Sequence, residues 1–147
     1  HFLGVTKQSV AAIVATSGNP HCHMILRGGD QGPNFSKPIL DEVRSKLEEQ
    51  GLTPRIMVDC SHANSGKDHM RQAEVAAELA QQIAQGAQSI FGVMLESFLE
   101  AGRQQQQAPE QLVYGQSITD ACMAWDTTAR CLQQLAEAVQ KRRAKQV

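Results

Sequence analysis

The sequence has no long run of apolar residues, few aromatic residues and no marked excess of charge of either sign. No stretch approaches the roughly 20 apolar residues that a transmembrane helix needs, and the chain does not open with a basic segment followed by a hydrophobic one. The formal net charge is −1, and aromatic residues make up 4% of the 147 positions. Since this balance offers no broad basic surface, we expect a soluble, cytoplasmic protein that binds neither nucleic acid nor a membrane.

Two familiar motifs are also missing from the sequence. The four cysteines, Cys22, Cys60, Cys122 and Cys131, form no C-x-x-C pair, which favours reduced, buried thiols over a disulfide framework. No G-x-G-x-x-G follows a strand-like run, so a dinucleotide-binding fold has no support. The chain has no initiator methionine and starts in a strand-like run, so we expect it to be a piece of a longer protein.

Apolar runs alternate with helical patterns along most of the chain. Strands are predicted at residues 23–26, 56–58 and 89–95, and helices begin at Ser36, Ser65 and Ser117, each a typical N-cap residue. The short runs 2–6 and 9–16 are compatible with either strand or helix. Strands that alternate with helices predict a parallel sheet covered by helices. With about four units visible, the sheet is either open and doubly wound or part of a (β/α)8 barrel.

Three of the strand-like runs end in a residue that could carry chemistry. Arg27, His62 and Glu96 are separated by 35 and 34 residues, about the length of one strand-plus-helix unit. His62 belongs to RIMVDCSHANSGK (residues 55–67), the stretch around which the sequence is organised. Because α/β proteins place their active sites at the carboxyl ends of parallel strands, we expect the three side chains to face one site.

Each candidate also has a purely structural interpretation. Arg27 precedes two glycines and suits a phosphate or carboxylate, but could be a surface arginine in a tight turn. His62 and Glu96 could share a divalent cation, or be a structural histidine and a solvated glutamate. Asp120 could be a third ligand, or the last residue of an S-x-x-D capping box. Cys60 could also be a ligand, although core packing is favoured. One histidine and two carboxylates suit manganese, iron, cobalt or zinc.

Six motifs resemble those of one enzyme family. They are ILRGG (25–29), PNFS (33–36), VDCSHANSGK (58–67), GVMLES (92–97), AGRQ (101–104) and YGQSITDAC (114–122). In order and separation they are similar to the type I 3-deoxy-D-arabino-heptulosonate 7-phosphate (DAHP) synthases, the first enzymes of the shikimate pathway. The similarity runs from His1 to the final helix and covers the C-terminal part of that family's chain. Ala101 and Arg103 differ from the family's usual EGNQ.

The resemblance implies a fold and a reaction. Residues 1–147 would form a single partial domain, the C-terminal half of a (β/α)8 barrel. The reaction would be the metal-dependent condensation of phosphoenolpyruvate with erythrose 4-phosphate to give DAHP and phosphate. His62, Glu96 and Asp120 would be catalytic residues and three of the four ligands of the divalent metal, and Arg27 would bind the phosphate of phosphoenolpyruvate.

The resemblance also implies partners. The family's fourth metal ligand, a cysteine, and its other phosphate-binding motifs do not occur in this sequence, so the missing N-terminal half of the barrel is an expected partner and the chain alone should turn over little substrate. The segment VTK (5–7) resembles one near the family's pocket for an aromatic amino acid effector. Exposed edges of a half-barrel favour a homo-oligomer. The alternative function is a non-catalytic half-barrel that self-associates or binds an aromatic amino acid.

Overall fold

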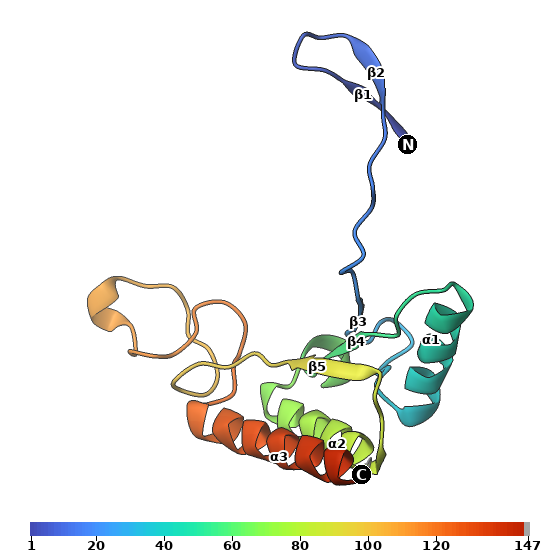
Figure 1. The fold of residues 1–147 in the computed structure, drawn as a ribbon. Helices are drawn as coiled ribbons and strands as arrows, with labels where there is room; N and C mark the ends of the chain where they lie inside the picture. The colour runs from blue at the N-terminus through green and yellow to red at the C-terminus, as the bar shows by residue number, and fades with distance from the viewer. Residues whose placement is uncertain (146–147) are drawn as a thin grey trace.

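Three parallel strands form the central sheet of the computed structural model, which describes residues 1–145. Strands β3 (Met24–Leu26), β4 (Ile56–Asp59) and β5 (Ile90–Met94) follow one another in the order of the sequence. Helices connect successive strands, as parallel pairing requires. The predicted mixed α/β class with a parallel sheet is therefore confirmed, and the three predicted strands are found within two residues of the expected bounds (Figure 1).

Three helices pack against the sheet. Helix α1 (Lys37–Glu49) connects β3 to β4, α2 (Gln72–Gln85) connects β4 to β5, and α3 (Trp125–Ala144) follows the long loop after β5. Helices α2 and α3 lie side by side beneath the sheet (Figure 1). Within residues 1–145, no helix is both long enough and apolar enough to cross a bilayer.

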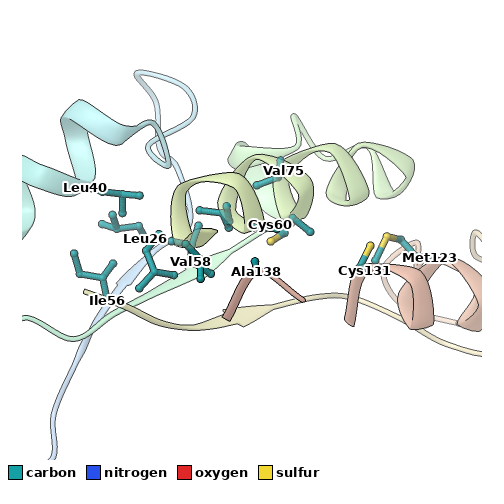
Figure 2. Close-up of a cluster of buried hydrophobic side chains, with 14 residues drawn as sticks. Leu26, Leu40, Ile56, Val58, Cys60, Val75, Met123, Cys131 and Ala138 are labelled. Atoms are coloured by element: carbon teal, nitrogen blue, oxygen red, sulfur yellow. The ribbon is translucent and has the colours of Figure 1, made fainter. Parts of the chain in front are cut away.

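The buried core lies between the sheet and these helices (Figure 2). Its apolar members are Leu26, Leu40, Ile56, Val58, Cys60, Val75, Ala76, Leu79, Ala80, Ile83, Ile90, Met123, Cys131 and Ala138. Ile56, Val58 and Leu79 are completely buried, and burial of such a side chain contributes about 1.5–3 kcal/mol to folding. The core therefore fixes β4 and the start of the polar segment that follows it.

Helix α1 agrees with the sequence-based prediction. Pro38 occupies its first turn, where a missing N–H costs no hydrogen bond. Leu40 is buried, and Val43 and Leu47 pack against the core. Ser36 is the N-cap residue as predicted, but its side chain makes no capping hydrogen bond.

The predicted start of α2 at Ser65 is wrong. The residues after β4 form two short 3-10 turns, His62–Asn64 and His69–Arg71, and α2 begins only at Gln72. The Ser65 hydroxyl donates to the backbone carbonyl of His62, and the Asp68 carboxylate accepts from the N–H of Met70. The side chains of Ser65 and Asp68, whose S-x-x-D spacing is typical of a capping box, thus stabilise turns.

The predicted start of α3 at Ser117 is also wrong, because the helix begins at Trp125. The preceding segment is held by longer-range backbone hydrogen bonds: the N–H of Cys122 donates to Gly102 and that of Met123 donates to Glu96. These bonds keep the segment non-helical, so Asp120 lies in a loop and caps no helix.

The basic end of α3 is only partly exposed to solvent. Lys141 and Arg143 are exposed. Arg142, however, donates to the carbonyl of Ala87 at 2.7 Å, and Lys145 donates to that of Ala84 at 2.9 Å. These two cations bind carbonyl groups at the C-terminal end of α2, where the helix dipole favours positive charge.

The two runs left open at the N-terminus are strands. Strands β1 (Phe2–Val5) and β2 (Ala11–Val14) pair antiparallel as a hairpin. The hairpin stands apart from the helices and the parallel sheet, and an extended segment links it to β3 (Figure 1). Leu3 and Ile13 pair directly across the strands, and each is 78% exposed.

The cysteines are free thiols, and two of the four are buried as expected. Cys60 follows β4 and Cys131 lies in α3, and both belong to the core. The prediction of burial is wrong for Cys22, which is exposed because it precedes β3, and holds only partly for Cys122 in the loop before α3.

Candidate metal and phosphate site

The register of the sheet brings the polar ends of the three strands together. Leu26 pairs with Val58, and Asp59 pairs with Met94, so the residues that follow each strand emerge at the same end of the sheet. Arg27, His62 and Glu96 line one pocket of about 450 Å³ at that end. Asp120, from the loop before α3, lines the same pocket. The four residues singled out from the sequence thus lie around a common space.

His62 is oriented by Asp59, the last residue of β4. The Asp59 carboxylate is buried and lies 2.8 Å from the Nδ1 atom of His62. Its other oxygen accepts from the backbone N–H and the hydroxyl of Ser61, at 2.8 and 2.6 Å. A carboxylate only accepts hydrogen bonds, so Nδ1 carries a proton. In the neutral ring this leaves the lone pair on Nε2, the nitrogen available to a metal ion.

The backbone of His62 also has an unusual conformation. Its φ angle of 52° lies in the left-handed region, which residues with a Cβ rarely adopt. The carbonyl of His62 accepts from the N–H of Lys67 at 2.7 Å, which closes the turn and stabilises this conformation. Such strained residues cluster at functional sites.

Glu96 faces the free nitrogen of His62. Its Oε1 atom lies 3.8 Å from Nε2, and both side chains are about 30% exposed. Partial burial raises the pKa of Glu96, and the nearby carboxylates of Asp120 and Asp59 raise it further; His62 and Arg27 act in the opposite direction. The carboxylates of Glu96, Asp120 and Asp59 are thus close enough to influence one another, and a cation among them would be stabilised.

The donor atoms of His62 and Glu96 fit a shared divalent cation. Two ligands that each lie about 2.1 Å from one ion are at most about 4.2 Å apart, and the observed separation of 3.8 Å is within that limit. Within residues 1–145, no three His, Cys, Asp or Glu side chains are grouped closely enough to hold a metal ion. Asp120 lines the pocket without completing such a group. The pocket thus offers two donor atoms at a separation that one cation could span, with a third carboxylate in the lining.

The lining of the pocket also contains basic residues. Arg27 lines the pocket together with Lys67 and Arg103. Gly28, directly after Arg27, has a φ angle of 73°. It packs so closely against the turn after β4 that an added Cβ would lie 2.7 Å from the Cβ of Ala63. Only glycine suits this position, and the resulting tight turn keeps Arg27 at the pocket. Three cations facing one space can bind a phosphate or carboxylate.

A buried asparagine links the arginine and histidine sides of the site. The amide nitrogen of Asn64 donates to the carbonyls of Leu26 and Asp59, at 3.2 and 2.7 Å, and so joins the ends of β3 and β4. Its oxygen accepts from the N–H of Asn34 at 2.8 Å. The side-chain oxygen of Asn34 in turn accepts from the N–H of Gly28 at 2.7 Å. This chain of hydrogen bonds fixes the position of Arg27 relative to His62.

Several residues of the pocket were not identified from the sequence. Lys67 and Arg103 belong to motifs noted above, so their positive charge beside the other candidates was an available signal. His69 and Gln72 also line the pocket, but only the folded chain brings them there. Asp59 was visible three residues before His62, and its role depends on a turn that the sequence pattern does not reveal.

A larger hollow of about 720 Å³ lies at the opposite, amino-terminal ends of the strands. Its lining cations are Lys37, Arg44 and Arg55, and the first two form ion pairs within α1, with Asp41 and Glu48 respectively. Because two of these three charges are already compensated, this hollow offers weaker grounds for a ligand than the smaller pocket. The candidate site is therefore the pocket at the carboxyl ends of the strands, where α/β proteins carry out chemistry.

Comparison with known proteins gives consistent matches. The model of the DAHP synthetase I family matches residues 1–133. The phenylalanine-sensitive phospho-2-dehydro-3-deoxyheptonate aldolase of Escherichia coli K12 is 51% identical over 97% of this chain and 40% of its own length. The tyrosine-inhibited enzyme of that name from Schizosaccharomyces pombe is 50% identical over 99% of this chain and 40% of its own length.

A solved structure of a phospho-2-dehydro-3-deoxyheptonate aldolase from Francisella tularensis SCHU S4 is similar in fold. It superposes with a TM-score of 0.83 at 49% sequence identity, over 97% of this chain and 41% of that one. The chain thus spans about 40% of the length of these relatives. With a family match over most of its residues and relatives that are about half identical, the chain belongs to the DAHP synthetase I family, as its motifs predicted.

Proposed function

We propose that this chain supplies part of the active site of a DAHP synthase, which condenses phosphoenolpyruvate with erythrose 4-phosphate to give DAHP and phosphate. The observation that carries the proposal is the pocket in which a histidine–carboxylate pair and a guanidinium group face one space. A divalent cation and a phosphorylated substrate are ligands that such groups bind. The names of the relatives, which describe phospho-2-dehydro-3-deoxyheptonate aldolases, support the same reaction.

We further propose that residues 1–147 are a single partial domain, the C-terminal half of a (β/α)8 barrel. The parallel strands alternate with helices, and within residues 1–145 the outer edges of β3 and β5 have no strand partner. Ile25, Phe91 and Met94 are 44%, 49% and 39% exposed. The remaining strands of a closed barrel would pair with these edges and cover such side chains. The missing N-terminal half is therefore the proposed partner.

Each residue has a proposed role. His62 and Glu96 hold a divalent cation, which is manganese, iron, cobalt or zinc, and Asp120 is the third donor from the same pocket. Bound there, the cation would supply Lewis-acid chemistry, which could polarise the aldehyde or activate a water molecule. Asp59 keeps the proton on Nδ1 of His62, so that Nε2 remains a ligand. Arg27 orients the phosphate of phosphoenolpyruvate and neutralises its charge.

The experiment that tests this function measures phosphate release from phosphoenolpyruvate and erythrose 4-phosphate with Mn²⁺. It compares the chain alone with a chimaera, in which the chain is joined to the part of the Escherichia coli relative that the match does not cover. We expect little turnover by the chain alone and clear turnover by the chimaera.

In the chimaera, His62→Ala should lower activity at least about 100-fold. Loss of a metal ligand should cost at least as much as loss of a residue that orients one, which typically lowers activity by about 10–100-fold. His21→Ala, in the exposed linker, is the control; equal activity of both variants would refute the ligand role.

A second candidate is a non-catalytic half-barrel that forms homo-oligomers or binds an aromatic amino acid effector. The exposed apolar hairpin favours it, because a lone two-stranded hairpin is marginally stable in water and needs a covering surface. The hairpin segment Val5–Lys7 is the proposed effector contact, and relatives are described as phenylalanine-sensitive and tyrosine-inhibited. Saturable calorimetric binding of phenylalanine or tyrosine by the chain, together with an inactive chimaera, would favour this function over the first.

A further inference from the structure

Gln72, the first residue of α2, has a side chain that is completely buried beside the site. Its amide oxygen accepts from the backbone N–H of Glu96 at 2.8 Å, and its amide nitrogen donates to the backbone carbonyl of Glu96 at 3.2 Å. One side chain thus binds both polar backbone groups of a single residue 24 positions away. The same nitrogen lies 3.3 Å from the carbonyl of His69, which fixes the orientation of the amide.

The backbone of Glu96 depends on these contacts because the sheet no longer supports it. Strand β5 ends at Met94, whose carbonyl makes the last ladder contact, with the N–H of Cys60 at 2.9 Å. Two residues further on, the carbonyl of Glu96 accepts from Met123 at 2.9 Å as well as from Gln72. The N–H of Glu96 is bound by Gln72. Gln72 and Met123 therefore hold Glu96 from two sides.

The direction of the Glu96 side chain follows from the position of its backbone. The carboxylate reaches to 3.8 Å from Nε2 of His62, and a rotation of the peptide units around Glu96 would move it away. We propose that Gln72 is a positioning residue, which holds the backbone of Glu96 so that its carboxylate and His62 face one divalent cation. This inference rests on the proposed function of the pocket. It assigns to Gln72 no contact with the substrate or with the cation.

The chain contains a matched control for this role. Gln82 lies on the same helix, is 8% exposed, and donates through its amide nitrogen to the carbonyl of Phe35 at 3.0 Å. Replacing either glutamine with methionine removes a buried amide and keeps the side-chain length. Of the two glutamines, Gln72 is the one that hydrogen-bonds to Glu96. A purely structural role of the two amides therefore predicts similar effects of both substitutions on the site.

The test is a Mn²⁺ titration of the chain, in which electron paramagnetic resonance measures the free ion. We expect Gln72→Met to weaken Mn²⁺ binding by about 10–100-fold, the usual effect of losing a residue that orients a metal ligand. Gln82→Met should leave the affinity within about twofold. Gln72→Asn, which keeps the amide but is one methylene shorter, provides a second variant and should also weaken binding. Equal affinities for Gln72→Met and Gln82→Met would overturn the inference.

A crystal structure of the Gln72→Met chain without metal separates this inference from the proposed function. We expect the distance between Nε2 of His62 and the nearer oxygen of Glu96 to exceed about 4.2 Å, the limit for two ligands of one ion. An unchanged distance would show that Gln72 does not position Glu96. If instead the unmodified chain bound Mn²⁺ no better than His62→Ala, the proposed metal site would fail, while the crystal structure would still decide the role of Gln72.

Discussion

Single residues around His62 determine what the site can bind. The Asp59 carboxylate keeps a proton on Nδ1, and a side chain without negative charge would hold the ring less firmly. We expect Asp59→Asn to weaken Mn²⁺ binding by the chain about 10–100-fold. Asp126→Asn, on the exposed first turn of α3, is the control. Isothermal titration calorimetry measures both affinities, and an unchanged value for Asp59→Asn would show that the carboxylate does not support the ligand.

The buried thiol of Cys60 connects stability with pH. Burial raises its pKa from 9.0 to about 12, and Asp59 and Cys131 add to the shift. In the unfolded chain the thiol ionises at an ordinary pKa, so the folded state retains a proton that the unfolded state releases between these two values. The stabilisation is complete below about pH 8.5 and falls as pH rises, by up to about 1.4 kcal/mol per pH unit from this group.

Urea unfolding at a series of pH values tests this dependence. Between about pH 9 and pH 11, the free energy of unfolding of the unmodified chain should fall more steeply than that of Cys60→Ala. The variant is less stable at every pH because it leaves a cavity, so only the slope is compared. Equal slopes would mean that the thiol does not ionise differently in the two states.

At the scale of elements, the sequence predicted the strands well and two helix starts poorly. Strands β3, β4 and β5 are short apolar runs bounded by polar residues, and burial in the sheet agrees with that local pattern. The S-x-x-D patterns at Ser65 and Ser117 gave wrong helix starts, because turn hydrogen bonds hold the segment after Ser65 and long-range hydrogen bonds hold the segment after Ser117. Met123 bonds to Glu96, 27 positions earlier, and no local pattern contains that information.

The same reasoning explains how much of the candidate site was predictable. Arg27, His62 and Glu96 follow strands, so the spacing of the strands was enough to predict that they face one pocket. Asn64 and Gln72 act through contacts with backbone groups of distant residues, and Asp59 contacts the ring of His62 across a turn. None of these contacts leaves a periodic signal. Sequence motifs identified the candidate ligands, while the residues that orient them emerged only from the folded chain.

The turn after β3 allows a direct test of how an element positions the site. Gly28→Ala places a Cβ at a φ angle of 73° and 2.7 Å from the Cβ of Ala63, so both backbone strain and overlap oppose it. We expect a loss of about 2–4 kcal/mol in the free energy of unfolding. Gly29→Ala is the matched control, because its Cβ would meet no atom within 4 Å, and should change stability by about 0.5 kcal/mol or less. Urea denaturation measures both, and similar losses would contradict the steric argument.

At the scale of the whole molecule, the chain has more apolar surface than its core can cover. Its core lies on the helix-facing side of three strands, while Ile25, Phe91 and the hairpin residues Leu3 and Ile13 remain exposed. The chain also spans about 40% of the length of its relatives. Uncovered faces of this kind mark interfaces, either with the rest of a barrel or with another copy of the chain.

The hairpin and the sheet can be distinguished as sites of self-association by changing one of them. Leu3 and Ile13 pair across β1 and β2, so Leu3→Lys with Ile13→Lys places two charges on one face of the hairpin. If copies of the chain associate through that face, sedimentation equilibrium should show a shift toward monomer at a given concentration. Gln81→Lys with Gln85→Lys adds the same charge on the exposed side of α2 and should leave the equilibrium unchanged. Equal shifts for both pairs would assign the effect to net charge, and no shift for either would place association at the sheet, where the missing half of the barrel is expected to bind.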